Sequence, residues 1–469
     1  MRRRRRRIRR VPVCANLVQN PRFEAGFDQW NFSGSLGLAT GLPFAGNQAI
    51  RMHSSSSSIW KDVALAGVSG RPLLLSFNLF ASLEAADLIV EVIWLDRHLR
   101  AIGVGRHMYI GADTLTGEFN AKITFFEITD RPPANAAFAR LQFSKLEGDE
   151  NSFIEIDQII LAPVRSINLV QNYGFESGLT EWNASDFVAD YDLPLVGGGH
   201  ARGEGDGLLS QEVYIGNQPL GSSYLLSFAL SLTETAAVET TVRVQWLDRD
   251  SNIISQGLQF LVPEESLLGR SACLTYLAVT SPAPGGAVWA RISFETQGAG
   301  VFDYRVDQVL FSRILTPNLV QNPSFENDLN DWEFDSTTTT NTLSAYEGNW
   351  VASMPASGAF LEQQIPLNRA AGRCYLLSFA LKVARLAEFG EAVLLAKVLW
   401  LDRTGREIGP GLALVARGDH SVANASTWLV YAAITDPAPA GAAAAKVLFT
   451  MRSSENANLA LDHVVFAQL

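Results

Sequence analysis

The sequence predicts an all-β chain of three tandem β-sandwich units, and three observations support this fold class. One stretch, NLVQN followed by Phe-Glu and then Trp, occurs three times, starting at Asn16, Asn168 and Asn318. Each copy continues with short apolar runs separated by Gly, Pro and polar turn residues, which is typical of a sandwich or jelly roll. No helical period of useful length interrupts these runs.

The repeat also sets the domain organisation of the 469 residues. A copy of about 150 residues is long enough to bury its own core. We predict an arm at 1–15 and jelly-roll domains at 16–164, 168–314 and 318–469. The links between these domains are three residues long, 165–167 and 315–317, so we expect closely spaced domains rather than flexible beads.

About eight strands are expected in each copy. In the first copy the expected strands are NLVQN itself, 48–52, a strand ending near Val63, 73–79, 90–97, 124–130, 137–143 and 154–161. Corresponding runs recur in the other two copies. A Pro/Ala/Gly loop precedes the second-to-last strand in all three copies.

Alternation within a strand predicts which side chains face the core. Val242, Val244 and Trp246 share one face of their strand, whereas the residues between them are polar. A period of two with one polar face is typical of a half-buried antiparallel strand. Core packing is therefore expected for the aromatics that recur in every copy. These are Trp94, Trp246, Trp400, Phe23, Phe175, Phe325, Trp30, Trp182 and Trp332.

Aromatic residues that differ between copies are better candidates for binding. Trp60 aligns with Ser210 and Glu362, and Trp350 aligns with Gln48 and His200. Positions that accept polar residues are expected to be exposed, and an exposed Trp can stack on a sugar or pack into a partner. Packing at the edge of the same domain is the alternative.

The charge is unevenly distributed along the chain. The formal net charge is −11, yet eight Arg lie in the first ten residues; without them 29 basic residues face 48 acidic ones, a net of −19. The arm is expected to be a flexible tail, a segment that docks on an acidic neighbouring subunit, or, least favoured because the acidic body repels phosphates, a nucleic-acid contact. The apolar stretch of a standard export signal does not follow it, and no run is long enough to span a membrane.

The three cysteines, Cys14, Cys273 and Cys374, have no metal-binding spacing. Cys273 and Cys374 lie in or beside apolar runs and are expected to be small core residues. Cys14 lies on the arm, where we predict an intermolecular disulfide as a hypothesis.

No catalytic constellation is found. None of the six His recurs in all three copies, and no triad, phosphate-binding loop or GxSxG motif is present. A Glu/Asp pair does recur and would suit acid–base chemistry, but a structural role explains its triplication more directly. We therefore expect a protein that is not an enzyme.

The repeated unit resembles carbohydrate-binding modules of families 4 and 9, which share a galactose-binding-like jelly roll. The matching residues are NLVQNxxFE with its downstream Trp, PAPAGA followed by AAKVLF, and the final apolar-Asp-x-apolar strand. In such domains the Glu of the Phe-Glu pair and the Asp of the last strand commonly help to hold a structural calcium ion. The resemblance thus implies calcium at Glu24 with Asp157, Glu176 with Asp307, and Glu326 with Asp462. Calcium takes six to eight oxygen ligands, so loop carbonyls would be needed as well. The alternative is that these carboxylates accept backbone N–H bonds and close the sandwich.

The start of the chain, MRRRRRRIRRVPVCANLVQNPRFE, also resembles the domain that precedes collagen-like repeats in spore-forming bacteria. No Gly-X-Y repeat follows here. This resemblance implies a spore-surface or cell-exterior location, with the cytoplasm as the fallback. The first functional expectation is a non-enzymatic structural protein that assembles with copies of itself or with other surface-layer proteins. The alternative is a glycan-binding protein that uses Trp60 or Trp350.

Overall fold

The computed structural model describes residues 15–41, 43–53, 55–68, 70–82, 85–112, 114, 122–232, 238–267, 270–298, 303–342, 344–385, 392–417, 427–453 and 457–469. These residues form almost only antiparallel strands, which confirms the predicted all-β class. We call β1–β10 unit 1, β11–β18 unit 2 and β19–β29 unit 3. Among the described residues, no helix is long and apolar enough to cross a membrane.

Unit 1 consists of two five-stranded sheets. The outer sheet has the order β1 (Asn31–Ser33), β4 (Ser57–Ala64), β9 (Phe138–Lys145), β6 (Leu88–Leu95), β7 (Ala101–Ile110). The inner sheet has the order β2 (Leu36–Ala39), β3 (Ala49–Met52), β10 (Ile154–Pro163), β5 (Leu73–Ala81), β8 (Lys122–Ile128).

Unit 3 repeats this topology. Its outer sheet is β20 (Glu333–Phe334), β23 (Phe360–Pro366), β28 (Ala444–Ser453), β25 (Ala392–Leu401), β26 (Glu407–Ala416). Its inner sheet is β21 (Thr339–Asn341), β22 (Val351–Met354), β29 (Asn458–Ala467), β24 (Leu376–Arg385), β27 (Leu429–Ile434), and the short β19 (Glu326–Leu329) precedes both.

In unit 2 the two sheets are continuous, because the 15-residue strand β12 runs through both. The order is β15 (Ile253–Val262), β14 (Val238–Leu247), β17 (Trp289–Gly298), β12 (His200–Tyr214), β18 (Tyr304–Ile314), β13 (Ser223–Leu232), β16 (Arg270–Val279). Strand β11 (Asn183–Asp190) pairs with β12, and a short 3-10 turn, η1 (Glu264–Ser266), follows β15.

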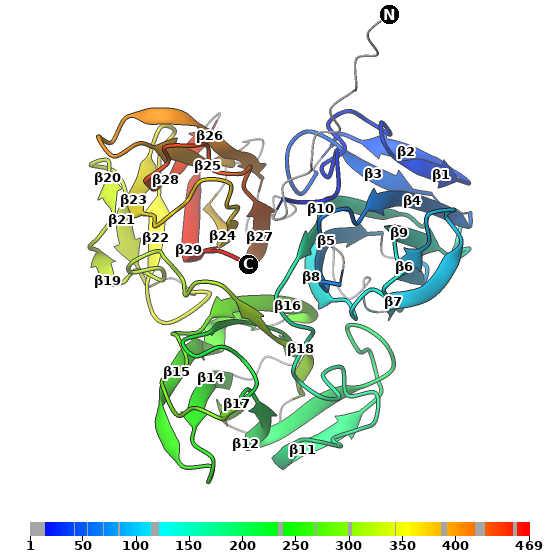
Figure 1. The fold of residues 1–469 in the computed structure, drawn as a ribbon, viewed down its shortest axis with the longest axis horizontal. Helices are drawn as coiled ribbons and strands as arrows, with labels where there is room; N and C mark the ends of the chain where they lie inside the picture. Colours follow the sequence, from blue (N-terminus) through cyan, green and yellow to red (C-terminus); the bar gives the residue numbers. More distant parts are fainter. Residues whose placement is uncertain are drawn as a thin grey trace, which may run out of the picture.

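The three units surround a common centre rather than forming an open row (Figure 1). Strands β8, β16 and β27, one from each unit, meet there. The Thr124 hydroxyl of unit 1 donates to Val430 O of unit 3 at 2.8 Å, and the Thr275 hydroxyl of unit 2 donates to Thr124 O at 2.6 Å. Unit 3 has Val430 at this position, and the hydroxyl of its Tyr346 donates to Thr275 O at 2.9 Å instead. These three bonds close a ring with approximate threefold symmetry.

Burial differs between the outer and inner sheets because the three units pack together through their inner sheets. In the outer strand β14 buried and half-buried residues alternate, with Val242, Val244 and Trp246 inside, as the sequence predicts. The inner strand β10 is buried at every position, because its second face packs against the other units. The recurrent aromatics are also buried, which confirms their predicted core role: Trp94, Trp246, Trp400, Phe23, Phe175, Phe325, Trp30, Trp182 and Trp332.

The expectation that NLVQN forms a strand is wrong. Residues 16–20 are irregular, and the Asn16 side chain bonds to the last strand, donating to Ile159 O at 2.8 Å and accepting from Leu161 N at 3.0 Å. Asn20 and Phe23 then adopt positive φ of 52°, which ends any extended run. The strand β7 was not predicted at all, since its sequence AIGVGRHMYI contains two Gly and lacks clear alternation.

Candidate functional site

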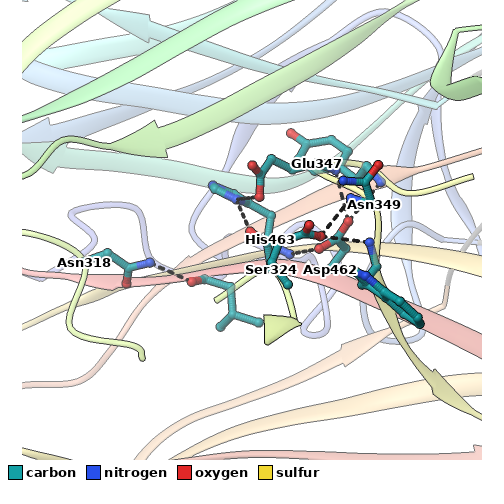
Figure 2. A network of polar contacts seen from close by, with 10 residues as sticks. Asn318, Ser324, Glu347, Asn349, Asp462 and His463 are labelled. Carbon is teal, nitrogen blue, oxygen red and sulfur yellow. Dashed lines mark hydrogen bonds and ion pairs between the residues drawn. The ribbon is translucent and has the colours of Figure 1, made fainter. Parts of the chain in front are cut away.

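The Glu/Asp pairs that recur in the three copies each hold one loop of their unit. In unit 3, Asp462 Oδ2 accepts bonds from Tyr346 N at 2.9 Å and Glu347 N at 3.0 Å, while Glu326 Oε1 accepts from Asn349 N and Trp350 N, both at 2.8 Å. Figure 2 shows Asp462 beside Glu347 and Asn349, with His463 next along the chain. We call each such carboxylate pair with its loop a clasp.

The clasps of units 1 and 2 have the same design. Asp157 Oδ2 accepts from Ala45 N at 2.8 Å, and Asp307 Oδ2 accepts from Leu195 N at 2.9 Å. Glu24 accepts from Asn47 N and Gln48 N, and Glu176 accepts from Gly198 N. The Asp is buried and the Glu is exposed in every pair.

Each clasp places a glycine that joins its unit to the preceding one around the ring. Gly46, Gly197 and Gly348 have φ of 71°, 80° and 73°, a region that disfavours other residues. An added Cβ would also collide with the clasp Glu in all three units. Their N–H groups donate to Val415 O, Tyr109 O and Leu261 O of the preceding unit at 2.9, 2.7 and 2.9 Å. The clasps therefore build the three junctions, which we name 1–2, 2–3 and 3–1 after the units that meet there.

Calcium at these pairs stays a prediction. The structure gives the carboxylates amide donors, and burial raises the pKa of Asp157, Asp307 and Asp462 well above the usual range. Within the described ranges, no group of three or more His, Cys, Asp or Glu side chains could hold a metal. In this structure the pairs accept backbone N–H bonds, which is the alternative role that the sequence suggests for them.

The two predicted tryptophans differ in their position relative to the clasps. Trp60 is only half-buried on β4, with the Arg140 guanidinium 5.9 Å from its ring centroid, and Trp350 is 39% exposed beside the unit 3 clasp. The alignment of Trp350 with His200 is wrong by one residue. In each unit one strand residue pairs with the residue before the clasp Asp, namely Ile50, Ala201 or Ala352. His200 directly precedes Ala201, so it corresponds to Ala49 and Val351.

The cysteines differ from one another. Cys273 is buried and forms no disulfide, as expected for a small core residue. Cys374 is buried but disulfide-bonded, so the expectation of a simple core residue is wrong for it. Cys14, for which an intermolecular disulfide is predicted, lies outside the described residues, as does the arm up to residue 14.

A pocket of about 660 Å³ lies at the 1–2 junction. Strand β7 of unit 1 forms one wall, and the clasp and NLVQN-Tyr segment of unit 2 form the other. Its lining residues are Arg106, His107, Tyr109, Asn172, Tyr173, Gly174, Glu176, Val196, Gly197, Gly198 and Gln308. Neither Trp60 nor Trp350 is among them.

Two tyrosine rings and a guanidinium dominate this pocket. Tyr109 is 39% exposed, and Tyr173 is partly buried. The Arg106 guanidinium lies 4.8 Å from the centroid of Tyr173, a cation–π contact. It also pairs with Glu127, with Nε 2.6 Å from Oε2 and Nη2 2.9 Å from Oε1. Glu127 is buried, and this burial raises its pKa to about 7 although Arg106 opposes the shift.

Four residues in or directly behind this pocket are replaced at the other two junctions. At the level of Arg106 the other units have Leu258 and Leu412, and at the level of Glu127 they have Ala278 and Ala433. Tyr173 corresponds to Pro21 and Pro323, and Tyr109 to Leu261 and Val415. Arg106, Glu127, Tyr109 and Tyr173 are therefore specific to the 1–2 junction, whereas the clasp Glu recurs at all three.

Sequence reasoning missed this site because its residues come from two repeats and from an unpredicted strand. The available signal was the comparison between copies: Tyr173 stands where the other NLVQN motifs have Pro. The sequence analysis names only Trp60 and Trp350 as aromatics that differ between copies.

Comparisons with known proteins bear on the fold alone. Searches against protein-family models and against curated proteins find no match. Among solved structures, the tandem CBM22-1–CBM22-2 domain of Paenibacillus barcinonensis Xyn10C is similar at 14% identity, over 65% of this chain and 99% of that one, with a TM-score of 0.25. TmCBM61 in complex with β-1,4-galactotriose is similar at 18% identity, over 31% of this chain and 97% of that one, with a TM-score of 0.24.

The enzymatically active domain of bacteriophage CBA120 tailspike protein 4 is similar at 22% identity over 32% of this chain, with a TM-score of 0.26. The match spans 21% of the tailspike chain. At such identities and TM-scores, the function of this chain has to be argued from its own residues.

Proposed function

We propose that the chain is a non-catalytic glycan-binding protein whose sugar site is the pocket at the 1–2 junction. The observation that carries the proposal is a contrast at four positions: the 1–2 junction has Arg106 with its partner Glu127, Tyr109 and Tyr173, where the other two junctions have Leu, Ala, Val and Pro. The volume of about 660 Å³ is within the range of small-ligand sites, roughly 300–1,000 Å³.

The lining suits a sugar ring. The C–H face of a pyranose packs on an aromatic ring, as Tyr109 and Tyr173 permit, while its hydroxyls need planar hydrogen-bonding groups at the edge. Gln308, buried at the pocket floor with no partner for Oε1 in the described structure, and the exposed Glu176 supply acceptors. Gly174, Gly197 and Gly198 let a ligand approach the backbone closely.

The test is a glycan array followed by calorimetry on the best glycan. The key variant is Arg106→Leu with Glu127→Ala, which installs the pair that unit 3 has, Leu412 and Ala433. Trp60→Ala and Trp350→Ala are the controls. Binding that is lost in the double variant and kept in both controls supports the proposal. Binding that is lost only in a Trp control would place the sugar site at that Trp instead of at the 1–2 junction. An array without hits would refute the glycan function.

A second candidate is a structural role in a surface layer of a spore or cell. Its support is the closed ring, in which one apolar cluster includes residues of all three units, as expected of a rigid building block. The spore-surface location rests on the Arg-rich start alone. Negative-stain microscopy of the full chain, and of a chain lacking the first 15 residues, tests this role: ordered arrays that need the arm support it, and monodisperse particles contradict it.

A further inference from the structure

The Arg106–Glu127 pair is buried where two units meet. Both oxygens of Glu127 face the Nε/Nη2 edge of Arg106, and Glu127 has 1% of its side chain exposed against 20% for Arg106. The pair thus fixes the orientation of the guanidinium whose face covers Tyr173. Arg106 and Tyr173 both line the pocket, whereas Glu127 lies behind them.

The fold does not require this pair. Units 2 and 3 build the same strands around Leu258 with Ala278 and around Leu412 with Ala433. Replacing a buried ion pair by apolar residues is often neutral or stabilising, because the attraction barely repays the loss of hydration. A stabilising role therefore explains the pair poorly, and a role in shaping the pocket explains it better.

Building on the proposed function, we propose that Glu127 is a positioning residue that couples sugar binding to its own ionisation. As a carboxylate it holds the Arg106 guanidinium against Tyr173, which completes the wall of the pocket. As the neutral acid it loses one acceptor and the charge that clamps the guanidinium. The wall is then no longer held in place, and the sugar binds more weakly.

The surroundings of Glu127 fit a proton-linked role. Its pKa is raised to about 7 by burial, and Arg106 is the charged side chain that opposes the shift. Its partner on β5 is the apolar Leu75. The other titratable residues that face the pocket include Glu176 from unit 2 and His107, whose Nδ1 lies 3.2 Å from Glu91 Oε1. Sugar affinity should therefore be highest above pH 7 and fall below it.

The experiment is calorimetry with the array-selected glycan from pH 5.5 to 8, using the full chain. The wild type should bind roughly tenfold more weakly at the acid end, the size expected for losing one charge-assisted hydrogen bond. Glu127→Gln should bind weakly at every pH, and Glu127→Asp should recover part of the affinity and of the pH dependence. His107→Gln, the residue unit 2 has there, should keep the midpoint of the pH dependence, whatever its effect on the affinity itself. A Glu127→Gln variant that binds like the wild type, or a profile that disappears with His107, would overturn the proposal.

A readout without ligand separates this idea from the glycan function. The ¹⁵Nε signal of Arg106, assigned by its loss in Arg106→Leu, should shift with a midpoint near pH 7 in the wild type and stay constant in Glu127→Gln. A constant wild-type signal would refute the proton linkage even in a chain that binds glycans. A signal that titrates in a chain without glycan hits would refute the sugar function, and with it the coupling.

Discussion

The 1–2 and 2–3 junctions share a backbone and differ in what fills them. At both, a clasp holds a loop whose glycine N–H donates to the strand of the preceding unit. At the 2–3 junction Tyr346 stacks on Tyr276 with centroids 4.6 Å apart, and His463 lies 4.8 Å from Phe260. At the 1–2 junction Leu195 and Gln308 stand at the positions of Tyr346 and His463, and the pocket lies there. A pocket of about 360 Å³ lies at the 2–3 junction as well, beside Gly348 and Asn349. The comparison shows that the clasp sets the backbone geometry, while the side chains decide the size and lining of the pocket at each junction.

The 3–1 junction lies between these extremes. Phe44 stacks on Tyr431 at 4.2 Å, and Gln158 donates across the junction from Nε2 to Ala432 O at 2.7 Å. Gln158 also lines a pocket of about 260 Å³ at this junction, and the equivalent Gln308 lines the pocket of about 660 Å³ at the 1–2 junction. One amide at the same place in the fold thus lines a pocket at both junctions and forms a cross-unit hydrogen bond at the 3–1 junction.

The largest stability effect is expected from the buried half of a clasp. Asp462→Ala leaves Tyr346 N and Glu347 N without their acceptor, which should lower the free energy of unfolding by about 2–5 kcal/mol, because each buried unpaired donor costs about 1–3 kcal/mol. Glu326→Ala, whose partners can reach water, is the control and should cost about 1 kcal/mol. Urea denaturation followed by tryptophan fluorescence compares them; equal costs would contradict the clasp account.

Acid should lower the free energy of unfolding through protonation of His200 on β12. Burial, followed by the charge of Arg305, lowers the pKa of His200 to about 4 from 6.5. The unfolded state therefore binds the proton first, so stability should be lost as the pH falls from about 6.5 to about 4, by up to about 3 kcal/mol. His200→Val copies Val351 of unit 3 and should flatten this part of the stability–pH curve. A curve unchanged by the substitution would assign the acid sensitivity to other groups.

A smaller effect is expected at the central hydrogen-bond ring. Tyr346→Phe removes the donor to Thr275 O and should cost about 1–3 kcal/mol, since a buried carbonyl loses its partner. Val430→Thr adds the hydroxyl that units 1 and 2 have at this position. In the double variant it should restore part of the loss, measured by thermal unfolding. If the double variant is no more stable than Tyr346→Phe, a hydroxyl at residue 430 cannot replace the Tyr346 donor, and the proposed threefold equivalence of the ring is wrong.

The smallest effect is expected from removing calcium. Because the clasp carboxylates already accept amide N–H bonds, a chelator should shift the unfolding temperature by no more than about 2 °C, the lower end of the roughly 2–4 °C that about 1 kcal/mol produces in a domain of 150–250 residues. Scanning calorimetry with chelator and with added Ca²⁺ measures this. A larger drop that Ca²⁺ reverses would establish the calcium sites that the resemblance implies.

The sequence predicts the parts of this molecule that depend on one repeat. The period of two in β14 correctly orients Trp246, and the copies of Trp94 and Trp400 follow it. The sequence of one repeat cannot predict that β10 is buried on both faces, because the residues that cover its second face belong to other units. The NLVQN segment was mistaken for a strand because side-chain bonds from Asn16 replace a backbone ladder. The pocket was missed because Arg106 and Tyr173 lie in different repeats and become neighbours only through closure of the ring.

The central claim is that a glycan binds at the 1–2 junction, and hydrogen–deuterium exchange of the full chain with and without the array-selected glycan tests it most directly. Protection is predicted on 106–109, 172–176 and 196–198, with the corresponding segments of the 2–3 and 3–1 junctions unchanged. Protection centred on Trp60 or Trp350, or equal protection at all three junctions, would contradict the account.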